Sequence, residues 1–255
     1  MRVAALYDIH GNLPALEAVL AAVREAGVDA VIVGGDVLPG PMPEETLDLL
    51  GSLDVPVRYV RGNGDRETLA AVDGHALVTV PPAFQPPIRW CASALRTEQV
   101  DSMRTWQATL RLPLPGIGPV LFCHATPRSD TEIFTRATPE ARIAIAFGEA
   151  RAAMVVCGHT HMQFDRTIAG VRVVNAGSVG MPFGEPGAYW LVLDEGGPHF
   201  RWTPYDLEAA AARIRATAYP GAAGFAADHV LAPPGEDQMI AAFGEGGPSG
   251  RGRGA

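Results

Sequence analysis

Two histidines separated by one residue follow an apolar segment in the second half of the chain. Residues 152–157 are apolar throughout and end at Gly158, which is typical of a short buried strand. His159 and His161 come next, and residues two apart in an extended chain point to the same side. Imidazole is a common ligand of divalent metals. The pair indicates either a metal site or two loop histidines beside a core strand, and so short a motif does not decide between them.

Other polar side chains follow other strand-like segments in the same way. The candidate ligands collected by this pattern are Asp8, His10, Asp36, Asn63, His124, His159 and His161. The set mixes carboxylate, amide and imidazole without thiolate, which suits a catalytic site for Mn, Fe, Co, Ni or Zn better than a closed structural zinc. Seven ligands exceed the needs of one tetrahedral ion. Two ions that share a bridging carboxylate are therefore the simplest arrangement.

The elements that must position these residues alternate between strands and helices. Strands are expected at residues 3–7, 29–33 and 56–60, with helices between Asn12 and Gly27 and over 43–53. This order predicts a largely parallel sheet whose carboxyl edge carries the site.

The rest of the chain is expected to be less regular. Prolines at 81–82 and 86–87 are predicted to break the chain, and 97–110 is a weak helix. Further strands are expected at 119–123, 152–157, 164–168, 171–174, 189–193 and 200–204, and further helices at 139–150 and 206–217. We expect a domain over residues 1–217 and an Ala/Gly/Pro-rich extension over 218–255, largely disordered from 244.

Composition limits the classes of function. A net charge of −8 and a pI near 5.3 argue against a broad basic face for nucleic acid, although a small phosphoester substrate remains compatible if metal ions reverse the local charge. The three cysteines have no CxxC spacing and predict packing in a reducing cytoplasm. We expect neither a membrane span nor a signal peptide. The oligomeric state is left open.

Five motifs in order resemble those of the calcineurin-like metallophosphoesterases, over residues 3 to about 180. They are Asp8-x-His10, Gly35-Asp36, Gly62-Asn63-x-Asp65, His124 and Gly158-His159-x-His161. The chain looks most similar to the small bacterial and archaeal phosphodiesterase branch, because Gly40-Pro41 follows the second motif and Asn175-Ala176-Gly177-Ser178-Val179 recurs near the site.

The resemblance implies an α/β fold in which a two-sheet β-sandwich is flanked by helices. It also implies that Asp8, His10 and His161 hold one divalent ion, that Asn63, His124 and His159 hold a second, and that Asp36 bridges them. Manganese is the expected metal, with Fe, Zn, Ni or Co as alternatives. The implied activity is hydrolysis of phosphodiester or nucleotide-like phosphoester bonds through a metal-bridging hydroxide.

The chain departs from the family pattern after the ligand asparagine. Many members carry a histidine there that protonates the leaving oxygen, whereas this chain has Gly64. Asp65 is then either a weak catalytic acid or a turn residue, and water or His75 is another possible acid. His199 and His229 lie outside the motifs and are interpreted as structural or exposed.

Two other functions compete with hydrolysis of phosphoesters. A catalytically silent scaffold of the same fold would be expected to have lost ligand histidines, and this chain retains all of them. An amidohydrolase barrel usually has its His-x-His motif early and needs a bridging lysine, whereas here the histidine pair comes late. A phosphoprotein substrate is also disfavoured, because no arginine follows Asp36.

Overall fold

Short apolar segments form the strands, and amphipathic segments between them form most of the helices. The computed structural model describes residues 1–244. One sheet contains β1 (Val3–Leu6), β2 (Ala30–Val33), β3 (Val57–Tyr59), β9 (Ala188–Asp194) and β10 (Gly197–Thr203). The second contains β4 (Thr109–Leu114), β5 (Gly118–Cys123), β6 (Met154–Cys157), β7 (Gln163–Ile168) and β8 (Val171–Ala176). The helices are α1 (Leu13–Ala26), α2 (Pro43–Gly51), α3 (Asn63–Val72), a 3₁₀ turn (Pro82–Phe84), α4 (Gln85–Ala94), α5 (Thr97–Arg104), α6 (Glu140–Gly148), α7 (Leu207–Arg215), α8 (Ala222–Phe225), a π-helical turn (Ala226–Leu231) and α9 (Glu236–Gly244).

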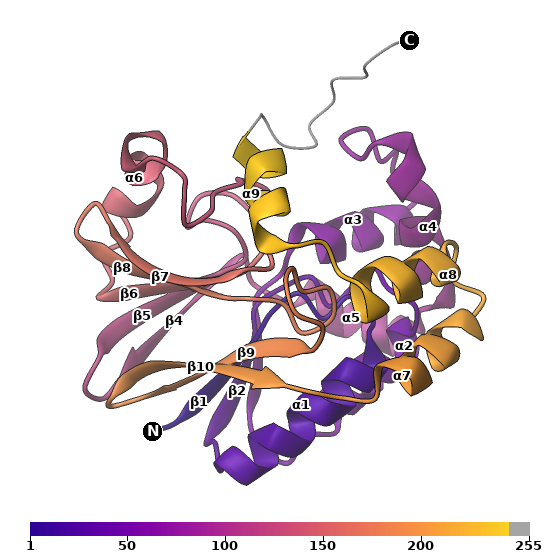
Figure 1. Ribbon diagram of the computed structural model, residues 1–255, viewed down its shortest axis with the longest axis horizontal. Helices are drawn as coiled ribbons and strands as arrows, with labels where there is room; N and C mark the ends of the chain where they lie inside the picture. Colours follow the sequence, from indigo (N-terminus) through magenta and orange to yellow (C-terminus); the bar gives the residue numbers. More distant parts are fainter. Residues whose placement is uncertain (245–255) are drawn as a thin grey trace.

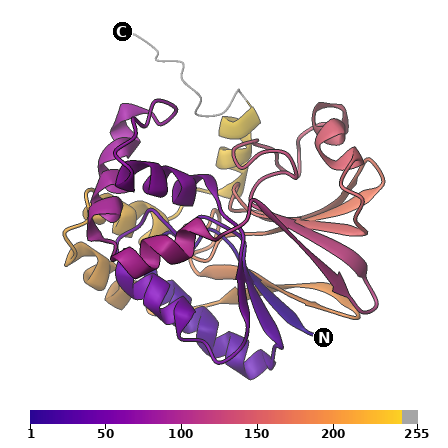
Figure 2. The ribbon, with the colours of Figure 1, turned by 180° about the vertical axis from the view of Figure 1, so that it is seen from behind.

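The two sheets pack face to face, and helices cover both outer faces (Figures 1 and 2). The alternation of side chains along β1 shows why. Val3 and Ala5 belong to the apolar cluster between the sheets, whereas Ala4 and Leu6 belong to the cluster under α1 and α2. The predicted α/β fold, a two-sheet β-sandwich flanked by helices, is therefore confirmed.

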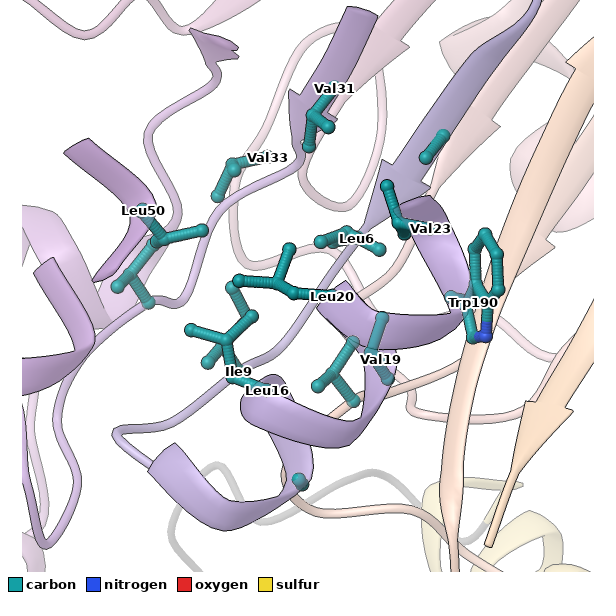
Figure 3. Close-up of a cluster of buried hydrophobic side chains, with 14 of the residues drawn as sticks. Leu6, Ile9, Leu16, Val19, Leu20, Val23, Val31, Val33, Leu50 and Trp190 are labelled. Atoms are coloured by element: carbon teal, nitrogen blue, oxygen red, sulfur yellow. The ribbon is translucent and has the colours of Figure 1, made fainter. Parts of the chain in front are cut away.

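Helix α1 illustrates how local sequence fixes the helical layer. Asn12 caps its first turn by accepting the Ala15 N–H, and Gly27 ends it in the left-handed conformation with φ of 60°. Its apolar stripe includes Leu16 and Leu20, which are buried against strand residues of the first sheet (Figure 3). This packing fixes the helix that follows the first polar loop.

Both sheets are mixed, so the expectation of one largely parallel sheet is wrong. The strand orders are β10-β9-β1-β2-β3 and β4-β5-β6-β8-β7. The parallel pairs are β1–β2, β2–β3, β5–β6 and β6–β8, and antiparallel hairpins extend each sheet beyond them. The strands of the late hairpins β7–β8 and β9–β10 were expected, whereas their attachment to the same two sheets was not.

The middle of the chain contains more structure than its sequence suggested. Pro86 and Pro87 lie in the first turn of α4 and start this helix, because a proline there gives up no helical hydrogen bond. Helix α3 was not predicted, and the weak helix expected over 97–110 is α5 followed by the beginning of β4.

The segment after residue 217 packs against the domain. Phe225 and Val230 are buried together with Ile214 of α7 and Leu13 of α1. Alanine favours helix, so an Ala-rich segment with a few large apolar residues can form these turns. The domain boundary at 217 stays a prediction, and residues 245–255, on which most of the expected disorder falls, lie outside the described residues. Within residues 1–244, no helix has the length and apolar character to cross a membrane.

Candidate metal centre

All seven candidate ligands come together where the two sheets meet. Four of them follow strands of the first sheet, and three follow strands of the second. The first set is Asp8, His10, Asp36 and Asn63, and the second is His124, His159 and His161. Parallel neighbours place their carboxyl ends at the same edge of each sheet, and the loops from those ends converge.

Most of these residues have an unusual backbone conformation. Five have a left-handed φ, namely Asp8 (53°), His10 (48°), Asp36 (51°), His159 (67°) and His161 (58°). Elsewhere in residues 1–244 only Arg151 and Ala169 share it among non-glycine residues. Neighbouring backbone holds the loops in place, since the Asp8 N–H donates to the Gly35 carbonyl at 3.0 Å. Strain of this kind persists where the surroundings fix it, and it clusters at functional sites.

The first group consists of Asp8, His10 and His161, whose ligand atoms lie within 4.8 Å of one another. Nε2 of His161 is 3.4 Å from Asp8 Oδ1 and 3.3 Å from Nε2 of His10. Asp8 Oδ2 accepts the backbone N–H of His159 at 2.8 Å. Oδ1 of Asp8, in contrast, is buried and has no hydrogen-bond partner among the described residues.

The second group consists of Asp36, His124 and His159, again within 4.8 Å. Nε2 of His124 lies 3.4 Å from Asp36 Oδ2 and 3.2 Å from Nδ1 of His159. The side-chain amide of Asn63 is also 3.2 Å from that Nδ1. Asp36 Oδ2 lies 3.9 Å from Nε2 of His10 in the first group, so this oxygen is situated between the two groups.

Backbone carbonyls orient three of the imidazole rings. Nδ1 contacts the Pro39 carbonyl at 3.3 Å in His10, the Gly34 carbonyl at 3.1 Å in His124 and the Met181 carbonyl at 2.6 Å in His161. A carbonyl only accepts, so each Nδ1 carries an N–H and each Nε2 faces the other ligands, with a lone pair when the ring is neutral. These carbonyl partners could not be named from the sequence.

The arrangement fits bound cations. When both rings are neutral, Nε2 of His10 and Nε2 of His161 direct two lone pairs at each other across 3.3 Å, beside Asp8 Oδ1, which has no hydrogen-bond partner among the described residues. A buried acceptor without a donor is rare in folded proteins, and a cation among these atoms satisfies all three. In the second group, the close approach of Asp36, His124 and His159 shifts the pKa values of both histidines. Burial opposes the charge on His124, yet Asp36 raises its pKa to about 10, while burial and then His124 lower the pKa of His159 to about 4.

Asp65 positions the neighbouring loop. It is fully buried, and it accepts the backbone N–H groups of Asp36, Leu38 and Gly62 at 2.9, 3.0 and 3.0 Å. Burial, with the nearby Asp36, raises the pKa of Asp65 to about 7. Both of its oxygens face backbone and the residue does not line the cavity described below, so the geometry gives no support to a catalytic acid there.

The loop over residues 175–180 supports the ligand loops from behind. Asn175 donates to the Gly158 carbonyl at 2.7 Å, and the Ser178 hydroxyl donates to the Asp8 carbonyl at 2.8 Å. The loop therefore lies near the site, as the sequence predicted. Its side chains contact the backbone of the two loops that carry Asp8 and His159.

A cavity of about 550 Å³ opens beside the two groups. Its lining includes the ligands His10, Asp36, Asn63 and His159, together with Glu67 and His229. His75 is exposed and lies outside this lining, and His199 contacts Asp194 at 2.9 Å. His229 was interpreted as structural or exposed, but it comes from the C-terminal segment and faces the site. No motif marks it, so sequence reasoning missed it.

The fold and the strand-end ligands define a class of protein. The family model of the calcineurin-like phosphoesterase superfamily domain matches residues 1–196. The chain belongs to the calcineurin-like phosphoesterase superfamily, whose members use divalent metals.

Two solved structures share the fold over nearly the whole chain. A protein from Pyrococcus horikoshii OT3, described as hypothetical protein PH1004, is 20% identical with a TM-score of 0.75, covering 95% of this chain and 97% of that one. A metallophosphoesterase from Sphaerobacter thermophilus is 24% identical with a TM-score of 0.67, covering 89% and 98%. At these identities the likeness concerns the fold alone. A comparison with curated proteins finds no match.

Proposed function

We propose that this protein is a dinuclear-metal-dependent phosphoesterase that hydrolyses phosphodiester or nucleotide-like phosphoester bonds. The observation that carries the proposal is the position of Asp36 Oδ2, which lies 3.4 Å from His124 Nε2 in one group and 3.9 Å from His10 Nε2 in the other. A carboxylate oxygen between two sets of imidazole lone pairs is suited to joining two ions.

In this proposal Asp8, His10 and His161 hold one ion, and Asn63, His124 and His159 hold the other. Bound divalent ions would supply the charge stabilisation and the activation of water at neutral pH that phosphoester hydrolysis needs. Within residues 1–244, the two ligand groups contain two carboxylates, Asp8 and Asp36, so two divalent ions would leave these groups positive and attractive to a phosphate.

We expect Mn²⁺ at this centre, with Fe, Zn, Ni and Co as alternatives, because carboxylate and amide oxygens combined with imidazole suit any of these ions. The carbonyls on Nδ1 of His10, His124 and His161 hold each ring in the tautomer that presents Nε2. Asp36 Oδ1 accepts the Gly64 N–H at 2.8 Å, which leaves Oδ2 free to face both groups.

Removal and return of the metal test the proposal. The full chain is stripped with a chelator, reloaded with Mn²⁺, Zn²⁺ or Mg²⁺, and assayed on a phosphodiester, a phosphomonoester and an amide. Hydrolysis of a phosphoester that returns with metal and is lost in His159→Ala supports it. The matched control is His199→Ala, because His199 contacts Asp194 and lies outside the cavity lining, so this variant should keep full activity.

Two results would contradict the proposal. Uptake of two ions per chain without turnover of any phosphoester would favour a silent scaffold of the same fold. Turnover that survives both chelation and His159→Ala would remove the metal centre from the reaction.

A further inference from the structure

The cavity beside the metal centre has a second side that the proposed hydrolysis does not explain. Candidate ligands form part of its lining, and two segments outside both sheets form much of the rest. These segments are residues 79–88, which lead into α4, and residues 219–229, which contain α8. We call their cavity-facing side chains the apolar wall. A volume of about 550 Å³ falls in the range of pockets that hold organic ligands, so a bare phosphate leaves most of it empty.

The apolar wall is built from hydrophobic and aromatic side chains. Val80, Phe84 and Ile88 come from the first segment, and Tyr219 and Phe225 from the second. Phe84 is 60% exposed, so much of its ring is available for contact with a ligand in the cavity. Flat aromatic faces beside a cavity are suited to stacking on another ring.

Aromatic contacts fix the wall before any ligand arrives. The Tyr219 ring meets Trp90 of α4 edge-to-face at 5.5 Å, and it meets Phe225 edge-to-face at 6.1 Å. Phe225 in turn lies 5.2 Å from the ring of His229. Tyr219 thus joins the second segment to α4, the helix into which the first segment leads, and side chains held in this way cost little entropy to order on binding.

The charge of the lining limits what the wall can accept. Among the described residues that line the cavity, none is lysine or arginine, and Glu67 adds a carboxyl group near Asp36. Recognition of a second phosphate or of an acidic peptide needs cationic donors. The ligand therefore has one phosphoryl group, placed at the metal centre, and an uncharged remainder.

One polar atom in the wall lacks a partner. Nδ1 of His229 is buried and makes no hydrogen bond within residues 1–244. Buried polar atoms in native proteins are nearly always paired, so this nitrogen needs a partner that the described residues do not supply.

We propose that the apolar wall binds the organic group of the substrate, and that this group is a flat aromatic or heteroaromatic ring system joined to a single phosphoryl group. This inference rests on the proposed function, because it names the substrate class of the same site. It excludes polyphosphates and phosphopeptides as preferred substrates.

Binding of two phosphonates to the Mn²⁺-loaded full chain tests the inference. Phenylphosphonate and methylphosphonate carry the same charged group and differ in the ring. Isothermal titration should show phenylphosphonate binding at least about tenfold more tightly, which corresponds to stacking on one aromatic side chain. In Phe84→Ala this preference should fall by roughly three- to tenfold, because the exposed face of the wall is lost.

Phe200→Ala is the matched control, since Phe200 is also exposed, at 41%, but lies on β10 outside the cavity lining. It should keep the full preference for the ring. Equal affinities for the two phosphonates in the wild-type chain, or an unchanged preference in Phe84→Ala, would overturn the inference.

Turnover of bis(p-nitrophenyl) phosphate, measured in parallel, separates this test from that of the proposed function. Turnover with no preference for the ring would refute the substrate class and leave the phosphoesterase standing. A preference for the ring with no turnover of any phosphoester would refute the phosphoesterase and leave a binding site for aromatic phosphates.

Discussion

Gly64 occupies the position at which many members of the family carry a histidine, and its surroundings leave no room for a side chain. A Cβ there would lie 2.3 Å from the Leu38 carbonyl oxygen and 2.8 Å from Cδ of Pro39. Both contacts involve parts of the chain that cannot rotate away. The absence of that histidine is therefore enforced by the path of the loop after β2.

Replacing this glycine should not restore a proton donor. We expect Gly64→His to lower the free energy of unfolding by about 1–3 kcal/mol, because the loop must shift to admit the side chain. Urea denaturation measures the change. Gly51→His is the control, because a Cβ at Gly51 meets nothing within 4 Å, and it should cost much less. Equal costs for the two variants would show that the Leu38 loop yields easily.

The candidate metal ligands could be predicted from the sequence, whereas the groups that hold those ligands in place could not. Asp8-x-His10 and His159-x-His161 were recognisable because a strand end and a two-residue spacing converge side chains on one side. The carbonyl of Met181 on His161, and His229 in the cavity wall, come from segments far along the chain. Such contacts depend on how loops fold over the site, which single-residue patterns do not encode.

At the scale of elements, the short helical segment after residue 221 both packs against the core of the domain and lines the cavity. Phe225 is 6% exposed and packs with α7, and it also lines the cavity as part of the apolar wall. We expect Phe225→Ala to destabilise the protein by about 3–5 kcal/mol, because a large core side chain is lost. Phe84→Ala in the same wall should change stability by no more than about 0.5 kcal/mol.

Urea denaturation of the two variants measures this difference in the free energy of unfolding. Phe84 should affect ligand binding without affecting the fold, whereas Phe225 should affect both. A cost below about 1 kcal/mol for Phe225→Ala would mean that the C-terminal segment is only loosely attached.

Elements with a strong apolar pattern could be predicted from the sequence, whereas elements that depend on tertiary contacts could not. The apolar segments at β1, β2 and β6 have the composition of buried strands wherever they lie. The prolines at 86 and 87 were predicted to break the chain, although proline in a first turn begins a helix, as in α4. The antiparallel extension of each sheet follows from pairing over long sequence separations, for which the local pattern gives no sign.

For the molecule as a whole, two histidines should affect stability in opposite pH ranges in the metal-free state. The pKa of His124 is raised from 6.5 to about 10, chiefly by Asp36 against the effect of burial. Its contribution to stability is fully present below pH 6.5 and is lost as the pH rises to 10. Burial, with His161 and His10 nearby, lowers the pKa of His229 to about 4, so its contribution is present above pH 6.5 and is lost as the pH falls to 4.

Denaturation curves at several pH values check these signs. The stability difference between wild type and His124→Gln should shrink as the pH rises from 6.5 to 10. The difference between wild type and His229→Gln should shrink as the pH falls from 6.5 to 4. A difference that stays constant over its range would show that the folded protein does not perturb that histidine.

Metal should also stabilise the whole fold. Each group of candidate ligands takes side chains from both sheets, as in Asp8 and His10 with His161. At a hundredfold excess over its dissociation constant, one bound ion adds about 2.7 kcal/mol, or roughly 5–10 °C in Tm for a domain of this size. Thermal scans of the stripped chain with and without Mn²⁺ measure the shift, and the double variant H159A/H161A should show little of it.

Because ligands of both groups bridge the two sheets, the proposed ions would be a cross-link as well as a reaction centre. Copies made while metal is scarce would open more often at the seam between the sheets and expose peptide bonds to proteases. The lifetime of the protein would then follow the supply of metal, because proteolysis would remove the chains that lack it.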